Sequence, residues 1–304
     1  MEIKDFKEVL ENARRKKASV PMAVAAAEDL HTLEAALKAY REKIVLPYLV
    51  GDKKKIVGRL RELGGDLPDE LIVEADDGED AARASIRLIR EGRAAFLMKG
   101  NLETSQILKA LLDKENGLGM GRTLTHMSLT HLPGYRKILA ITDAAILISP
   151  TLEQKRDVVA NAVQAFRDLG YERPQVAVLA AVEKVNPKMP ETVDAAELKK
   201  MWEAGEIGGC DLEGPISMDL AMNREAAEIK GYKSSVTGSP DILVMPNLVS
   251  GNILSKALRE FADSTTVGVV MGASVPMVLT SRGASVRSKY TSIALVSQMS
   301  VYMH

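Results

Sequence analysis

The chain has 304 residues, of which 46% are hydrophobic, 27% are charged and only 4% are aromatic. A formal net charge of -1 argues against nucleic acid as a partner, because binding along a phosphate backbone requires a basic face. The polar start is not a signal peptide, and no apolar run approaches the roughly 18 residues of a membrane span. We therefore expect a cytoplasmic protein without membrane contact, long enough to form two lobes.

The first part of the chain alternates apolar, β-rich runs with amphipathic helical patterns. We expect strands at residues 22–27, 44–50, 71–74 and 94–98, and helices at residues 30–43, 53–63, 79–91 and 104–114. Strands that alternate with helices in this way are typical of a parallel, doubly wound sheet. The pattern therefore predicts an α/β fold for this lobe.

The middle of the chain shows the same alternation and is expected to form a second lobe. Its predicted strands are residues 138–140, 144–148, 176–181 and 242–245, and its predicted helices are residues 151–169, 195–204, 216–229 and 251–262. The chain ends with predicted strands at residues 267–271 and 275–279 and a helix at residues 287–299.

Polar residues flanked by glycine or proline follow several predicted strands, in segments 99–101, 119–123, 246–252 and 280–283. Each segment taken alone is a weak signal and is more simply explained by ordinary turn chemistry. Together they place the cations Lys99, Arg122 and Arg282 in loops, and arginine suits a phosphate or carboxylate particularly well. Because α/β proteins bind ligands at the carboxyl ends of strands, these cations predict an anion-binding site.

Other kinds of chemistry find little support in the sequence. Cys210 is the only cysteine, so no intrachain disulfide is possible, and we interpret it as an inert structural thiol. His126 and His131 are five residues apart and do not share one helix face, so we expect no metal site. Gly119 and Gly121 lack the third glycine of a dinucleotide-binding loop.

Eight dispersed blocks carry a resemblance to a known family. They are residues 99–104, 117–122, 142–145, 181–189, 213–219, 241–247, 250–253 and 276–282. With these blocks in this order over nearly the whole chain, the sequence resembles the phosphate acetyl/butyryltransferase family, and most closely its butyryltransferase branch.

The resemblance implies a two-domain α/β fold similar to the isocitrate and isopropylmalate dehydrogenases, with a cleft between the domains. The first domain is expected to combine residues 1–133 with residues 265–304, and the second to span residues 134–264. The resemblance also implies a homo-oligomer, either a dimer or a larger assembly.

The reaction that the resemblance implies is reversible transfer of a short acyl group, butyryl or branched, between CoA and inorganic phosphate. Acyl-CoA and phosphate would give acyl phosphate and CoA. Both are small-molecule substrates, and the reaction needs neither a metal nor a cofactor besides the CoA substrate.

The same resemblance assigns roles to individual residues. Ser281 and Arg282 match the family's catalytic pair, in which serine donates a hydrogen bond in the transition state and arginine binds phosphate. The residues expected to bind phosphate or CoA are Lys99, Arg122, Asn247, Ser250, Asn252, Lys256 and Lys289.

One position departs from the acetyl-specific branch. Those members carry an aspartate, proposed to deprotonate CoA, where this chain has Ser288 between Arg287 and Lys289. An aspartate base therefore cannot be carried over. Lys289 could instead lower the pKa of the thiol by favouring the thiolate, and the alternative is a solvated surface charge.

Three further interpretations stay open at this point. The chain could be a phosphate acetyltransferase, because acyl-chain length depends on a few pocket side chains. It could be a non-catalytic protein that binds CoA or acyl phosphate, although Ser281 and Arg282 are present. A decarboxylating dehydrogenase would share the fold but requires metal-binding aspartates and a nucleotide site, which the sequence does not show.

Overall fold

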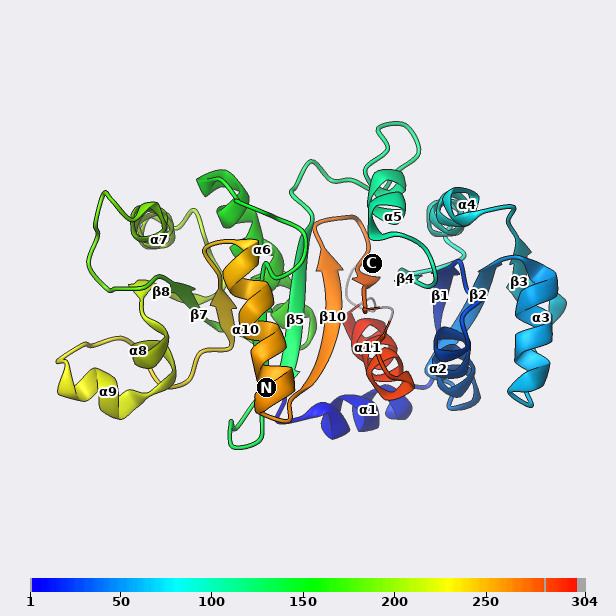
Figure 1. Cartoon of the computed structure of the whole chain (residues 1–304), viewed down its shortest axis with the longest axis horizontal. Coiled ribbons are helices and arrows are strands. Elements are labelled where there is room, and N and C mark those ends of the chain that lie inside the picture. The colour runs from blue at the N-terminus through cyan, green and yellow to red at the C-terminus, as the bar shows by residue number, and fades with distance from the viewer. Residues whose placement is uncertain (1, 282, 300–304) are drawn as a thin grey trace. The chain divides into compact units, whose positions relative to one another are not determined.

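A computed structural model of the chain describes residues 2–281 and 283–299 (Figure 1). The chain forms two compact units, each built around a sheet covered by helices. Unit 1 comprises Met1–Asp5 and Thr123–Thr266, and unit 2 comprises Phe6–Arg122 and Val267–His304. The α/β fold predicted from the sequence is confirmed. The domain boundaries expected at residues 133 and 265 stay a prediction.

The strands of unit 2 lie in the order β3-β2-β1-β4-β11-β10. All neighbours in this order are parallel except β10 and β11, which are antiparallel. The strands are β1 (Val20–Ala25), β2 (Val45–Gly51), β3 (Ile72–Glu74), β4 (Phe96–Lys99), β10 (Thr265–Met271) and β11 (Met277–Val278).

The helices of unit 2 are α1 (Phe6–Arg15), α2 (Leu30–Arg41), α3 (Lys53–Glu62), α4 (Gly78–Arg90), α5 (Thr104–Leu111) and α11 (Val286–Met299), with a short 3₁₀ turn at Asp69–Leu71. Aspartate side chains cap three of them by accepting a backbone N–H in the first turn. Helix α11 packs against α1 and α2, and every residue from Lys289 to Met299 is buried (Figure 1). The last segment of the chain thereby completes the core of the N-terminal segment.

The strands of unit 1 lie in the order β5-β6-β9-β7-β8. Only β5 and β6 are antiparallel. Its elements are β5 (Thr125–His131), β6 (Leu139–Thr142), α6 (Leu152–Asp168), β7 (Gln175–Leu179), α7 (Pro190–Glu203), β8 (Asp211–Ile216), α8 (Met218–Met222), α9 (Arg224–Ile229), β9 (Ile242–Val244) and α10 (Leu248–Phe261). In the described parts of both units, no helix is long and apolar enough to cross a membrane.

The predicted strands and helices are confirmed with five exceptions. Helix α1 and strands β5 and β8 were not expected. The start of the chain is polar, β8 carries acidic residues and a proline, and β5 contains His126, Ser128 and Thr130, which are buried all the same. The predicted strand at residues 144–148 is a loop. The predicted helix at residues 216–229 is divided into α8 and α9 at Asn223, whose side chain caps α9.

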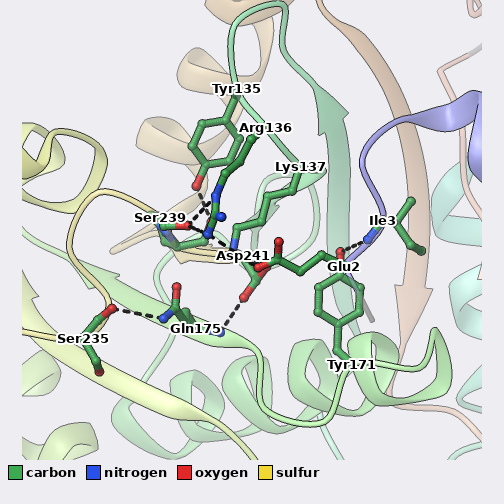
Figure 2. Close-up of polar contacts among 11 residues, drawn as sticks. Glu2, Ile3, Tyr135, Arg136, Lys137, Tyr171, Gln175, Ser235, Ser239 and Asp241 are labelled. Carbon is green, nitrogen blue, oxygen red and sulfur yellow. Dashed lines mark hydrogen bonds and ion pairs between the residues drawn. The ribbon is translucent and has the colours of Figure 1, made fainter.

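Glu2 and Ile3 anchor the N-terminal segment in unit 1, beside a buried ion pair between Lys137 and Asp241 (Figure 2). Lys137 Nζ lies 2.6 Å from Asp241 Oδ1 and 3.6 Å from Glu2 Oε1, and the Lys137 and Asp241 side chains are only 1% and 4% exposed. The Ile3 N–H donates to the Tyr171 hydroxyl at 2.8 Å. Burial raises the pKa of the Asp241 carboxyl, so the adjacent ammonium is needed to keep it ionised.

Replacing Lys137 should therefore destabilise unit 1 strongly. We expect Lys137→Met to lower the free energy of unfolding by about 3–5 kcal/mol, because it leaves a buried carboxylate without its counter-charge. Urea denaturation measures the loss. The double variant Lys137→Met/Asp241→Asn should be less destabilised than the sum of its single variants, since no buried charge remains. A Lys137→Met variant as stable as the wild type would contradict this role.

Candidate functional site

The loop that carries Ser281 connects β11 with α11 in unit 2. Ser281 is exposed, and its carbonyl accepts the Ala284 N–H at 3.0 Å, which closes a turn. Ser285 then accepts the Ser288 N–H on its side-chain oxygen at 3.2 Å, as an N-terminal cap does. Arg282 lies outside the described residues. The loop thus runs from the carboxyl end of a strand to the start of a helix, as the sequence predicts for an anion site.

Lys99 lies at the same edge of the sheet as Ser281. In the parallel pair of β4 and β11, Met98 is opposite Val278, so Lys99 is at the level of the residue two before Ser281. Lys99 is only 4% exposed, and its Nζ donates to the Gly100 carbonyl at 3.2 Å. The structure therefore brings these two predicted site residues to one strand end.

Close packing of the backbone against Ala25 and Ala26 explains why residue 100 is a glycine. The Gly100 N–H donates to the Ala25 carbonyl at 2.8 Å, and the Asn101 N–H donates to the Ala26 carbonyl at 2.7 Å. A Cβ atom at position 100 would lie 2.1 Å from the Ala26 carbonyl oxygen, so no side chain fits there. The close approach of the two backbones holds Lys99 in place.

Arg122 is exposed. The segment before it lies near the amino end of β11, whereas Ser281 follows the carboxyl end. The Leu118 carbonyl accepts the Ser274 N–H at 2.9 Å, and Gly119 bridges to Ala273, so this segment borders the turn that precedes β11. Ser281 follows the carboxyl end of β11, and Lys99 ends the neighbouring strand β4 at that same edge. No contact among the described residues joins Arg122 to either of them. The cradle of three cations stays a prediction.

Four further predicted residues lie on or just before α10 in unit 1. Asn247 caps the helix by accepting the Ser250 N–H at 3.0 Å, and the Ser250 hydroxyl donates to the Asn247 carbonyl at 2.9 Å. Asn252 Nδ2 donates to the Ala144 carbonyl at 3.1 Å. Lys256 is exposed one turn further along the helix. The side chains of Asn247, Ser250 and Asn252 thus form hydrogen bonds that stabilise the first turn of α10. This turn follows the carboxyl end of β9.

Lys289 is buried in unit 2 rather than lying on the surface. It is 2% exposed, and its Nζ donates to the Thr32 hydroxyl at 3.1 Å. Burial lowers the pKa of the Lys289 ammonium, and the nearby Asp29 carboxylate opposes that shift. The alternative of a solvated surface charge is therefore wrong for this residue.

Sequence reasoning missed a polar cluster at the carboxyl ends of β7 and β8. The Ser217 hydroxyl lies 2.5 Å from Glu183 Oε1 and 2.6 Å from Asp219 Oδ1, and Lys230 Nζ lies 2.9 Å from Asp219 Oδ2. The hydrogen bond from Ser217, followed by that from Lys230, lowers the pKa of Asp219 to about 2. Three residues of this cluster, Glu183, Ser217 and Asp219, lie in blocks 181–189 and 213–219 of the family resemblance. Their place in these blocks is the signal that could have revealed the cluster.

The residues considered for metal or thiol chemistry occupy structural positions. Cys210 is buried, and burial raises the pKa of its thiol to about 11, which disfavours a nucleophilic thiolate. His126 lies on β5, where its backbone N–H donates to the Asp143 carboxylate at 2.7 Å, and His131 ends that strand. In the described part of the chain, no group of three His, Cys, Asp or Glu residues is arranged to hold a metal ion.

Known proteins resemble this chain over almost its full length. Residues 73–297 match the family described as phosphate acetyl/butaryl transferase. The phosphate acetyltransferase of Thermotoga maritima is 41% identical over 90% of this chain and 93% of its own length. The phosphate butyryltransferase of Clostridium acetobutylicum is 39% identical over 97% of this chain and 98% of its own length.

A solved structure agrees with these relatives. The branched-chain phosphotransacylase of Enterococcus faecalis V583 superposes with a TM-score of 0.80 at 30% identity, and the match covers 92% of this chain and 99% of that protein. The chain therefore belongs to the phosphate acetyl/butyryl transferase family and is an acyltransferase.

Proposed function

We propose that this protein transfers a butyryl or branched short acyl group between CoA and inorganic phosphate, with Ser281 and Arg282 as its catalytic residues. The observation that carries the proposal is the exposed Ser281 at the end of β11, at the same sheet edge as Lys99 on β4. The neighbouring ends of β4 and β11 thus place a buried ammonium group and a hydroxyl group at one edge of the sheet, and the loop after β11 leads to a helix start. CoA is a substrate here, and the reaction needs no further cofactor.

The chemistry requires positioning and charge stabilisation more than proton transfer. An oxygen of inorganic phosphate attacks the thioester carbonyl carbon, and the resulting tetrahedral intermediate expels CoA as its thiolate. In this proposal Arg282 holds the phosphate, with Lys99 and Arg122 adding positive charge, and Ser281 donates a hydrogen bond to the developing oxyanion. Asn247, Ser250, Asn252 and Lys256 bind the phosphate or CoA groups of the substrates.

One observation favours a butyryl or branched acyl group. Ser288 replaces the aspartate of the acetyl-specific pattern, and in this structure its backbone N–H completes the cap of α11. A branched-chain phosphotransacylase and a butyryltransferase are among the relatives, which is consistent with this group. Phosphate acetyltransferase is the alternative, supported by the 41% identity to the enzyme from Thermotoga maritima.

The finer description of the fold is part of the same proposal. We propose the two-domain architecture of the isocitrate and isopropylmalate dehydrogenases. The discontinuous unit 2, which joins the first and last segments of the chain, supports this assignment. A homo-oligomeric state and a cytoplasmic location are also proposed on the strength of the family resemblance.

A substrate panel tests the acyl group. Purified protein with phosphate and acetyl-, butyryl- or isobutyryl-CoA should release thiol, and kcat/KM should be highest for butyryl- or isobutyryl-CoA. Release of free thiol over time measures each rate. A higher kcat/KM for acetyl-CoA would favour the acetyltransferase alternative, and no release from any substrate would reject the proposed reaction.

Removing either catalytic side chain should slow the reaction in a distinct way. Ser281→Ala should lower kcat about 10²–10³-fold, because it removes a donor to the oxyanion. Arg282→Ala should raise the KM for phosphate or abolish turnover. Arg287→Ala is the matched control, since Arg287 is an exposed arginine in the first turn of α11. Near-normal activity of Arg282→Ala would contradict the assignment.

The proposed effect of Lys289 on the CoA thiol predicts a pH shift. If the ammonium favours the thiolate, Lys289→Met should raise the thiol pKa, so the rate of CoA attack on acyl phosphate should begin to rise at a higher pH. The pH dependence of kcat/KM for CoA measures this. Thr32→Val removes the hydrogen-bond partner and keeps the charge, so it controls for positioning. An unchanged pH profile of Lys289→Met would contradict the effect.

A further inference from the structure

A buried carboxylate outside the predicted site shapes the segment that follows β6. Asp143 is 3% exposed, and its carboxylate accepts the backbone N–H groups of His126, Ala145 and Ile146, each at 2.7 Å. These donors replace the hydration that the charge loses on burial. Because two of these donors lie two and three residues after Asp143, the carboxylate folds residues 143–146 into a fixed turn.

The start of α10 rests on this turn. Asn252 Nδ2 donates to the Ala144 carbonyl at 3.1 Å. Gly251 is buried, and a Cβ atom there would lie 2.5 Å from the Asp143 carbonyl oxygen, so the helix backbone touches the turn directly. Any shift of residues 143–144 must therefore move the first turn of α10.

The same helix start carries three residues of the proposed substrate site. The fold engages Oδ1 of Asn247 and Nδ2 of Asn252, which leaves the other amide group of each without a partner among the described residues. The direction of these two groups depends on where the helix begins. A substrate phosphate that binds them would therefore sense the position of the turn beneath.

We propose that Asp143 is a positioning residue for substrate binding, acting through the turn of residues 143–146 and the contacts of Gly251 and Asn252. This inference rests on the proposed function of α10, because it concerns how the helix start is held for the phosphate-bearing substrates. Asp143 itself is buried beneath the turn and is not expected to touch them.

Kinetics of Asp143→Asn in the full chain test the proposal. The amide retains one acceptor oxygen but places an NH₂ group against at least one backbone N–H. We expect the KM for acyl-CoA or phosphate to rise at least fivefold while kcat stays within threefold of the wild type. Unchanged KM values for both substrates, or a loss confined to kcat, would overturn the proposal.

Asp241→Asn is the matched control. Asp241 is also buried and accepts a backbone N–H, that of Gln175 at 2.7 Å, but it precedes β9 whereas Asn247 follows that strand. At a temperature where thermal unfolding shows both variants to be folded, Asp241→Asn should keep wild-type KM values. A rise equal to that of Asp143→Asn would assign the effect to general destabilisation and overturn the proposal.

Two further variants decide the matter if Asp143→Asn does not fold. Gly251→Ala and Asn252→Ala should each raise the same KM, and Asn252→Ala should do so without loss of secondary structure by circular dichroism. Gly58→Ala controls for the glycine substitution, because a Cβ there meets no atom within 4 Å. Wild-type KM values in both test variants would overturn the proposal.

Failure of the proposed function gives a different result from failure of this inference. If the wild type releases no thiol from any acyl-CoA, the proposed reaction is wrong, and CoA affinity by calorimetry then tests Asp143. Equal dissociation constants for wild type and Asp143→Asn, or no CoA binding by the wild type, would overturn the inference as well.

Discussion

The packing of α11 against α1 and α2 is the constraint on which the Ser281 loop depends. Gln298 donates to the Val9 carbonyl and the Tyr290 hydroxyl donates to Glu42, so the last helix is held by groups 289 and 248 residues earlier in the chain. Buried residues along α11 add apolar contact at roughly 25 cal/mol per Å² of area removed from water. The loop is fixed at both ends, by β11 and by α11.

Strand ends in unit 1 use their polar groups for the fold before any ligand binds. Asp143 after β6 and Asn247 after β9 satisfy backbone N–H groups, and Ser217 after β8 links two carboxylates. A buried backbone N–H without a partner would lower the stability of the fold. These side chains therefore have a structural role at the same positions where substrates are expected to bind. A substitution there changes the local geometry as well as any contact with a substrate.

The apolar pattern was sufficient to predict most strands and helices, because parallel strands buried on both faces appear as continuous hydrophobic runs. It failed where polar side chains determine the backbone. Residues 144–148 look like a strand, but the Asp143 carboxylate turns the chain there. The alternative that Lys289 is a surface cation fails as well, because every residue of α11 from Lys289 to Met299 is buried. Both errors concern tertiary contacts that no local pattern contains.

The lack of an aspartate base at position 288 reduces the rate of CoA attack only modestly. A CoA thiol of ordinary pKa, about 8.5, is about 3% thiolate at pH 7, so complete deprotonation could increase the reactive fraction only about 30-fold. Lowering that pKa by about one unit would already raise the thiolate fraction about eightfold. In the opposite direction the thiolate leaves without a proton, so the same transition state needs no general acid. A positive charge near the thiol can therefore replace a carboxylate base, whereas nothing else in the loop replaces the phosphate-binding role proposed for Arg282.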